Sequence, residues 1–147
     1  MIDSIKKLRD QTGLSVVDIK NALEEAGGDE KKALEILTSR GHEIAEKKSS
    51  RPIQEGAVES YIHPNRRVGA TVVLHCETDF VAKSPDFLEL IHDLAMQIAS
   101  MNPKDAGELM NQPFIKDQNL MIKELIAGYI AKLGENIKIG DFSRFTV

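Results

Sequence analysis

The residues best suited to covalent chemistry are one cysteine and four histidines, and their spacing does not favour catalysis. Cys76, the only cysteine, directly follows His75. A cysteine nucleophile needs a histidine ring that meets the thiol in space, yet neighbours in a β-strand point to opposite faces of the sheet. Free cysteine often behaves as a small buried hydrophobe, so we interpret Cys76 as a core residue. An enzyme that uses Cys76 is the least favoured of the functions considered.

Phosphate-binding loops and metal sites are not indicated either. Gly27-Gly28 lacks the spacing of a phosphate-binding loop, and no Lys-Ser or Lys-Thr pair follows at the required position. A single cysteine offers zinc no second thiol, and no two histidines stand four residues apart. We therefore predict no metal, no cofactor and no covalent catalysis.

Residues 77–83 form the chemically unusual segment, with two acids, a hydroxyl, a phenyl ring and a lysine in quick succession. The segment lies between a predicted strand and a predicted helix that begins at Ser84, a place where scaffolds often display functional residues. Phe80 beside Asp79 suits a wedge that contacts a partner protein. The alternative is that Phe80 and Val81 pack under the sheet while Asp79 closes a turn, and spacing alone leaves both open.

Composition and charge favour a globular protein with a protein or small-molecule partner. Of 147 residues, 41% are hydrophobic and 29% charged, and the net charge is −4. An acidic chain without a basic stripe is a poor candidate for binding nucleic acid directly, because phosphate neutralisation dominates such binding. No apolar run is long enough for a membrane span, and no signal-type segment opens the chain. We expect no membrane partner and a cytoplasmic location.

The first fifty residues predict three short helices. Thr12-Gly13 is typical of a helix end, Ser15 of a helix start with Asp18 three residues on, and Asp29 of a third start. Residues 1–41 are therefore predicted to form a small three-helix domain. Residues 42–55 are predicted to be a linker, although helix could continue through 42–48 before Pro52 disfavours it.

Residues 56–147 predict an α+β core in which helices pack a small antiparallel sheet. Residues 56–63 and 68–76 read as a hairpin, with alternating apolar residues in its second strand. Ser84-Pro85 starts a helix that stops near Asn102. A looser stretch is expected to about Lys116, then an amphipathic helix over 122–133. A closing strand over 137–147 is expected to contain a bulge at Gly140-Asp141.

The second predicted helix carries one apolar residue on its polar face. Its apolar stripe, which we expect to be buried, contains Val16, Ile19 and Leu23. Val17 instead falls in line with polar side chains. An exposed valine is common and harmless, so a contact patch at Val17 is a hypothesis beside that simpler explanation.

Three segments together resemble the elongation factor Ts family. Residues 8–23, LRDQTGLSVVDIKNAL, are similar to its N-terminal signature, and with Gly28-Asp29 and Ala33 they resemble its ubiquitin-associated-type three-helix domain. Residues 76–83, CETDFVAK, match its second signature, and residues 133–137, LGENI, resemble a third. The three segments occur in order and span most of the chain.

This resemblance implies a guanine nucleotide exchange factor that acts on elongation factor Tu without covalent chemistry. It implies binding to the GDP-bound and nucleotide-free partner, and GDP release through disturbance of the magnesium and phosphate side of the nucleotide site, after which GTP rebinds. The partner-binding residues that it implies in the core are Thr78, Asp79, Phe80, Val81, Ala82 and Lys83. Those that it implies in the N-terminal domain are Arg9, Val16 and Val17.

The chain also departs from the family pattern. Longer members carry two related core subdomains, whereas this chain is short between Ile98 and Phe114 and is expected to keep one. A homodimer that supplies the second half is therefore a hypothesis. A covalent dimer through the closing strand is excluded, since residues 141–145 contain no cysteine. The alternative from another class is an adaptor whose three-helix domain binds ubiquitin-like or other helical ligands.

Overall fold

The computed structural model describes residues 1–147 and opens with three helices whose predicted caps are all present. Helix α1 (Ile2–Thr12) ends at Gly13, which is left-handed at φ 68°. Helix α2 (Val16–Glu25) begins at Ser15, whose side chain accepts the amide hydrogen of Asp18. Helix α3 (Glu30–Lys48) begins at Asp29, whose carboxylate accepts two first-turn amides. Local capping chemistry therefore fixes where these helices start and stop.

A small apolar core joins the three helices. Its fully buried members are Leu8, Ile19, Ala22, Leu23, Ala33 and Leu37. Val16, expected in the buried stripe, is 43% exposed. It is the first residue of α2, so its side chain lies at the end of the helix, beyond the edge of this core.

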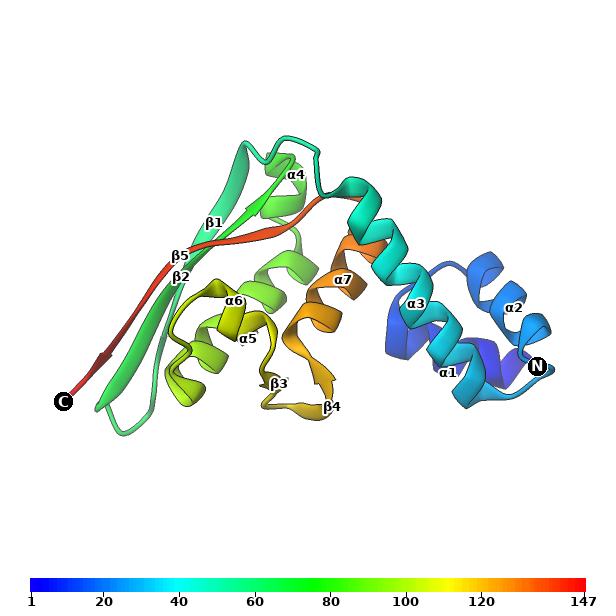
Figure 1. Cartoon of the computed structure of the whole chain (residues 1–147), viewed down its shortest axis with the longest axis horizontal. Helices are drawn as coiled ribbons and strands as arrows, with labels where there is room; N and C mark the ends of the chain where they lie inside the picture. Colours follow the sequence, from blue (N-terminus) through cyan, green and yellow to red (C-terminus); the bar gives the residue numbers. More distant parts are fainter.

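Helix α3 belongs to both parts of the molecule. Its first half supplies Ala33 and Leu37 to the small core, while Ala45 packs against the larger core. Near its middle, Gly41 is buried against helix α7. Figure 1 shows α3 running from the N-terminal helices to the sheet. Irregular chain follows only from residue 49 to 54, so helix fills the first half of the predicted linker.

A three-stranded antiparallel sheet lies at the other end of the molecule (Figure 1), in the order β1-β2-β5. Strands β1 (Glu55–Ile62) and β2 (Val68–Cys76) form the predicted hairpin. Strand β5 (Lys138–Thr146) pairs with β2 on the other side. The register shifts opposite Val73, where β5 carries Gly140 and Asp141 against one residue of β2. This shift confirms the predicted bulge.

One helix covers one face of the sheet, and a second helix packs against the first to complete the larger core. Helix α5 (Pro85–Met101) begins at Ser84, ends at left-handed Asn102 and packs directly on β1 and β2. Helix α7 (Ile122–Leu133) lies between α5 and α3 (Figure 1). The core-facing residues of β2 are the alternating set Ala70, Val72, Leu74 and Cys76. The α+β prediction with a helix-packed antiparallel sheet is confirmed.

Four short elements were not predicted. Helix α4 (Asp79–Ala82) is a single turn between β2 and α5. Helix α6 (Ala106–Met110) and the hairpin of β3 (Pro113–Phe114) with β4 (Asp117–Met121) occupy the stretch expected to be loose. Tertiary contacts rather than sequence periodicity define elements this short. None of the helices combines the length and the apolar character that a bilayer crossing requires.

Candidate functional site

The turn formed by α4 displays a phenyl ring. Thr78 caps this turn, because its Oγ1 accepts the amide hydrogen of Val81 at 3.3 Å. The amide of Lys83 closes it on the carbonyl oxygen of Asp79 at 3.1 Å. Phe80 points away from the protein and is 83% exposed. The structure therefore shows the displayed phenylalanine and not the packed one.

The six residues predicted to contact a partner divide into two groups. Thr78, Asp79, Phe80 and Lys83 are exposed. Val81 and Ala82 are only 6% and 7% exposed and belong to the main core. These two side chains therefore anchor the turn from below, and only the exposed four are placed where a partner could contact them.

A shallow, open hollow lies beside the ring of Phe80. Its walls are Asp79, Phe80, Lys83, Ser84 and Pro85. The carboxylate of Asp79 lies 3.7 Å from the ammonium of Lys83, with both side chains largely exposed. Exposed ion pairs of this kind stabilise a fold very little, so both charges are free to meet a partner.

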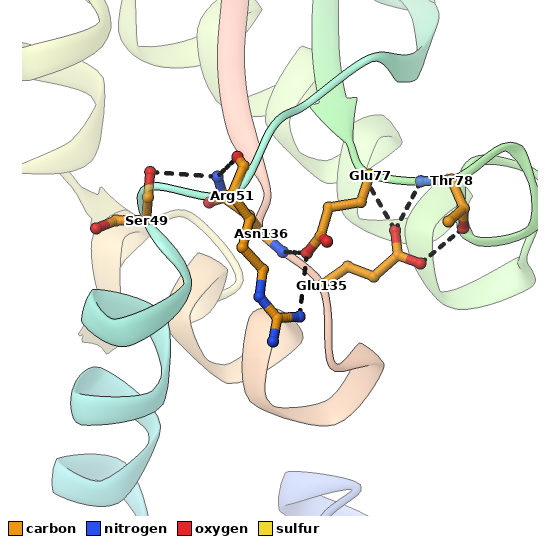
Figure 2. Close-up of polar contacts among 6 residues, drawn as sticks. All are labelled: Ser49, Arg51, Glu77, Thr78, Glu135 and Asn136. Carbon is orange, nitrogen blue, oxygen red and sulfur yellow. Dashed lines mark hydrogen bonds and ion pairs between the residues drawn. The ribbon is translucent and has the colours of Figure 1, made fainter.

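The carboxylate of Glu135 fixes the chain just before this turn. Its Oε1 accepts the amide hydrogens of Glu77 and Thr78, each at 3.0 Å. Its Oε2 accepts the hydroxyl hydrogen of Thr78 at 2.6 Å. Figure 2 shows Glu135 reaching from the loop between α7 and β5 to the end of β2. One side chain thus holds two consecutive peptide groups and the helix-capping hydroxyl.

Glu77 in turn binds the chain segment that contains Glu135. Its Oε2 accepts the amide hydrogen of Asn136 at 2.6 Å and lies 3.8 Å from the guanidinium of Arg51. The Asn136 side chain, buried at 1% exposure, donates to the carbonyl oxygens of Arg51 at 2.9 Å and Ser49 at 3.4 Å. Three distant segments therefore meet in one polar network (Figure 2).

Cys76 supports the same junction and is not placed for nucleophilic chemistry. Its side chain is fully buried, and its Sγ donates to the carbonyl oxygen of Thr78 at 3.2 Å. Burial, together with the negative charge of Glu135, raises the pKa of the thiol to about 11. The thiolate, which is the nucleophilic form, is thus disfavoured near neutral pH.

The predicted N-terminal contacts lie on a separate part of the molecule. Val17 is 66% exposed and Val16 43% exposed in the first turn of α2. Arg9 is exposed in the last turn of α1. The loop at Gly13 joins these two turns. Exposure of all three side chains fits a contact surface, while their binding role stays a prediction.

Sequence reasoning missed the residues that hold the site. Glu135 and Asn136 stand in a motif noted from the sequence, but nothing in their spacing pairs them with Glu77, 58 residues away along the chain from Glu135. The only signal available was their place in the segment LGENI, directly after Gly134, which ends helix α7.

Fold and site define a two-part α+β protein that displays exposed apolar side chains on helical turns. A family model described as Elongation factor TS matches residues 77–147. An elongation factor Ts from Thermotoga petrophila is 38% identical, covering 99% of this chain and 95% of its own length. That from Herpetosiphon aurantiacus is 37% identical over 99% and 96%. That from Rubrobacter xylanophilus is 38% identical over 98% and 97%.

The chain therefore belongs to the elongation factor Ts family and is a translation elongation factor. Its alignments to these relatives extend over 189 to 191 positions, more than the 147 residues of this chain. The relatives thus carry residues that this chain lacks.

Proposed function

We propose that this chain is a guanine nucleotide exchange factor that binds elongation factor Tu in its GDP-bound and nucleotide-free forms. It promotes GDP release by perturbing the magnesium and phosphate side of the nucleotide site, so that GTP can rebind. No covalent chemistry is needed, and this partner would place the chain in the cytoplasm. The observation that carries the proposal is the exposure of Phe80, whose side chain is 83% exposed on a turn held by hydrogen bonds between Glu135 and Thr78.

The phenyl ring supplies part of the free energy for exchange. Burying one phenylalanine contributes about 1.5–3 kcal/mol, which corresponds to roughly ten- to a hundredfold in affinity. If that energy is gained only when the phosphate side is disturbed, nucleotide binding weakens by the same factor. Larger effects require additional contacts, and Asp79 and Lys83 beside the ring are placed to make them.

The exposed residues Arg9, Val16 and Val17 form the second proposed contact. They would hold the N-terminal domain on the same partner and raise affinity without taking part in displacement. Because the linking helix α3 packs on both cores, the two contacts would be presented together.

Release of fluorescent GDP from elongation factor Tu tests this function directly. Wild-type chain should accelerate release, and the Asp79→Ala/Phe80→Ala double variant should lose most of the acceleration. Met101→Ala, which trims another exposed apolar side chain at the far end of α5, is the matched control and should behave as wild type. Wild-type chain without effect contradicts exchange; normal acceleration by the double variant contradicts the site.

A homodimer is the second proposal about partners. Val58, Ile62 and Phe145 are 67%, 64% and 70% exposed. Ile62 and Phe145 both pair with Gly69, so these side chains share the sheet face opposite the helices. A second copy could cover this face. Light scattering should give twice the chain mass, and a monomer at the concentrations used for exchange contradicts the dimer.

A further inference from the structure

We propose that Glu135 and Asn136 are positioning residues for exchange. Glu135 would fix the turn that carries Phe80, and Asn136 would fix the end of α3 that carries the N-terminal domain. The inference rests on the proposed function and extends it to two side chains that would act through the residues they hold.

Glu135 controls the direction in which the chain leaves β2. Thr78 has a single hydroxyl hydrogen, and the short 2.6 Å bond to Glu135 uses it. The same oxygen then presents its lone pairs to the Val81 amide, which it caps at 3.3 Å. Glu135 therefore orients the hydroxyl that starts α4. Phe80 is the second residue of that helix, so its direction follows from this arrangement.

Few other contacts restrain the exposed side of this turn. The ring of Phe80 is almost entirely in solvent, and the Asp79–Lys83 pair is exposed. The buried side is held by Val81 and Ala82. Loss of Glu135 would thus leave a folded core with a looser turn, which is the behaviour expected of a positioning residue.

Asn136 connects the same site to the N-terminal domain. Its backbone amide is bound by Glu77, which directly precedes the Phe80 turn. Its side-chain amide holds the carbonyl oxygens of Ser49 and Arg51, at the point where α3 ends. Adjacent residues therefore hold both contact surfaces, and Figure 2 shows the three segments converging. The consequence is that the two surfaces meet the partner with a set spacing and a low entropic cost of binding.

A double-mutant cycle on GDP release tests Glu135. Phe80→Ala should reduce acceleration by roughly ten- to a hundredfold, and Glu135→Ala should give a reduction of similar size. The combined variant should be no worse than Phe80→Ala alone, because both changes remove one interaction. Multiplicative losses would overturn the inference. Glu35→Ala, an exposed glutamate on α3 without a bonded partner, should leave release unchanged.

The Glu135→Gln variant tests which hydrogen bonds of Glu135 position the turn. Glu135→Gln keeps an oxygen for the two amide hydrogens but replaces the acceptor that faces the Thr78 hydroxyl. Its exchange activity should lie between those of the wild type and Glu135→Ala. Activity equal to that of the wild type would show that the hydrogen bond to the Thr78 hydroxyl does not orient the turn, and would overturn positioning through it.

A corresponding cycle tests Asn136. Val17→Ala and Asn136→Ala should each weaken binding to elongation factor Tu, and the double variant should lose less than the product of the two. The maximal release rate at saturating factor should stay near the wild-type value, since Phe80 is untouched. Independent losses, or a lower maximal rate with unchanged affinity, would overturn the role assigned to Asn136.

A measurement on the chain alone separates failure of this inference from failure of the proposed function. The sequence contains no tryptophan, so Phe80→Trp places one indole on the turn. Fluorescence anisotropy of that indole should fall when Glu135→Ala is added, while circular dichroism shows both variants folded. Unchanged anisotropy overturns positioning by Glu135, even if exchange itself is confirmed. Reduced anisotropy supports it, even if the wild type fails to release GDP.

Discussion

At the scale of single residues, Phe80 shows how a chain keeps an apolar side chain in water. Leaving a phenylalanine exposed forgoes about 1.5–3 kcal/mol of burial, so other contacts must hold the turn. Val81 and Ala82 pack beneath it, and Glu135 with Thr78 fixes the chain before it. The exposed ring thus depends on Thr78, Val81 and Ala82, which were predicted to contact the partner directly. It also depends on Glu135, which was not singled out for function.

The buried thiol of Cys76 and the partly buried phenol of Tyr129 give the stability a pH dependence at high pH. Burial raises the pKa of Cys76 from 9.0 to about 11 and that of Tyr129 from 10.0 to about 12. Between those values the unfolded chain releases a proton that the folded chain retains. Stability is therefore complete below pH 9.0 and falls as pH rises through about 11 and then about 12.

The midpoint of urea unfolding, measured across this pH range, checks the predicted direction of the change in stability. It should fall as the solution becomes more alkaline. Tyr129→Phe should weaken the upper part of the fall and Cys76→Ala the lower part. A midpoint that rises over this range, or a fall that both variants leave intact, contradicts the assignment.

At the scale of elements, the β3–β4 hairpin depends on one buried amide. Gln97 of α5 is fully buried; its Nε2 donates to the Pro113 carbonyl at 3.0 Å and its Oε1 accepts the Ile115 amide at 2.9 Å. Gln97→Leu leaves both backbone groups unpaired. A buried unpaired group costs about 1–3 kcal/mol, so we expect a loss of that order in urea unfolding.

The matched control is the same change on the hairpin surface. Gln118 of β4 is exposed and its side chain makes no hydrogen bond, so Gln118→Leu should alter stability by less than about 0.5 kcal/mol. Equal effects of the two substitutions would show that Gln97 does not anchor the hairpin. The effect of Gln97→Leu should also be local: amides of β4 should lose hydrogen-exchange protection before those of β2.

Sequence predicted the elements whose signals are local. Helices begin after Ser15, Asp29 and Ser84 because each side chain accepts the hydrogen of an unpaired amide no more than three residues away. The α4 turn and the β3–β4 hairpin were missed because each is too short to show a periodicity. Glu135 and Asn136 were missed as site residues because their partners are distant in sequence and close only after folding.

At the scale of the whole molecule, two cores of unequal size share one helix. The larger core has 19 buried apolar residues and the smaller has six. Figure 1 shows α2 and α4, which carry the two proposed contacts, on separate parts joined by α3. Contacts this far apart suit a protein partner rather than a small molecule. Their joint action requires that α3 stay ordered.

The size difference predicts that the N-terminal helices can unfold while the core remains. Leu23 is 1% exposed within the smaller core, and Leu→Ala changes at such sites cost about 2–5 kcal/mol. A six-residue core offers little reserve against that loss. In the Leu23→Ala variant, the amides of α1 and α2 should therefore lose their hydrogen-exchange protection. Amides of β2 and α5 should keep theirs.

The fate of α3 distinguishes this outcome from global unfolding. Its second half should stay protected, because Ala45 packs on the larger core and Asn136 holds the carbonyls of Ser49 and Arg51. Hydrogen exchange read by mass spectrometry resolves the two halves. Uniform loss across both cores would instead mean one cooperative unit. With local loss, Leu23→Ala should weaken affinity for elongation factor Tu while the Phe80-dependent acceleration persists at saturating factor.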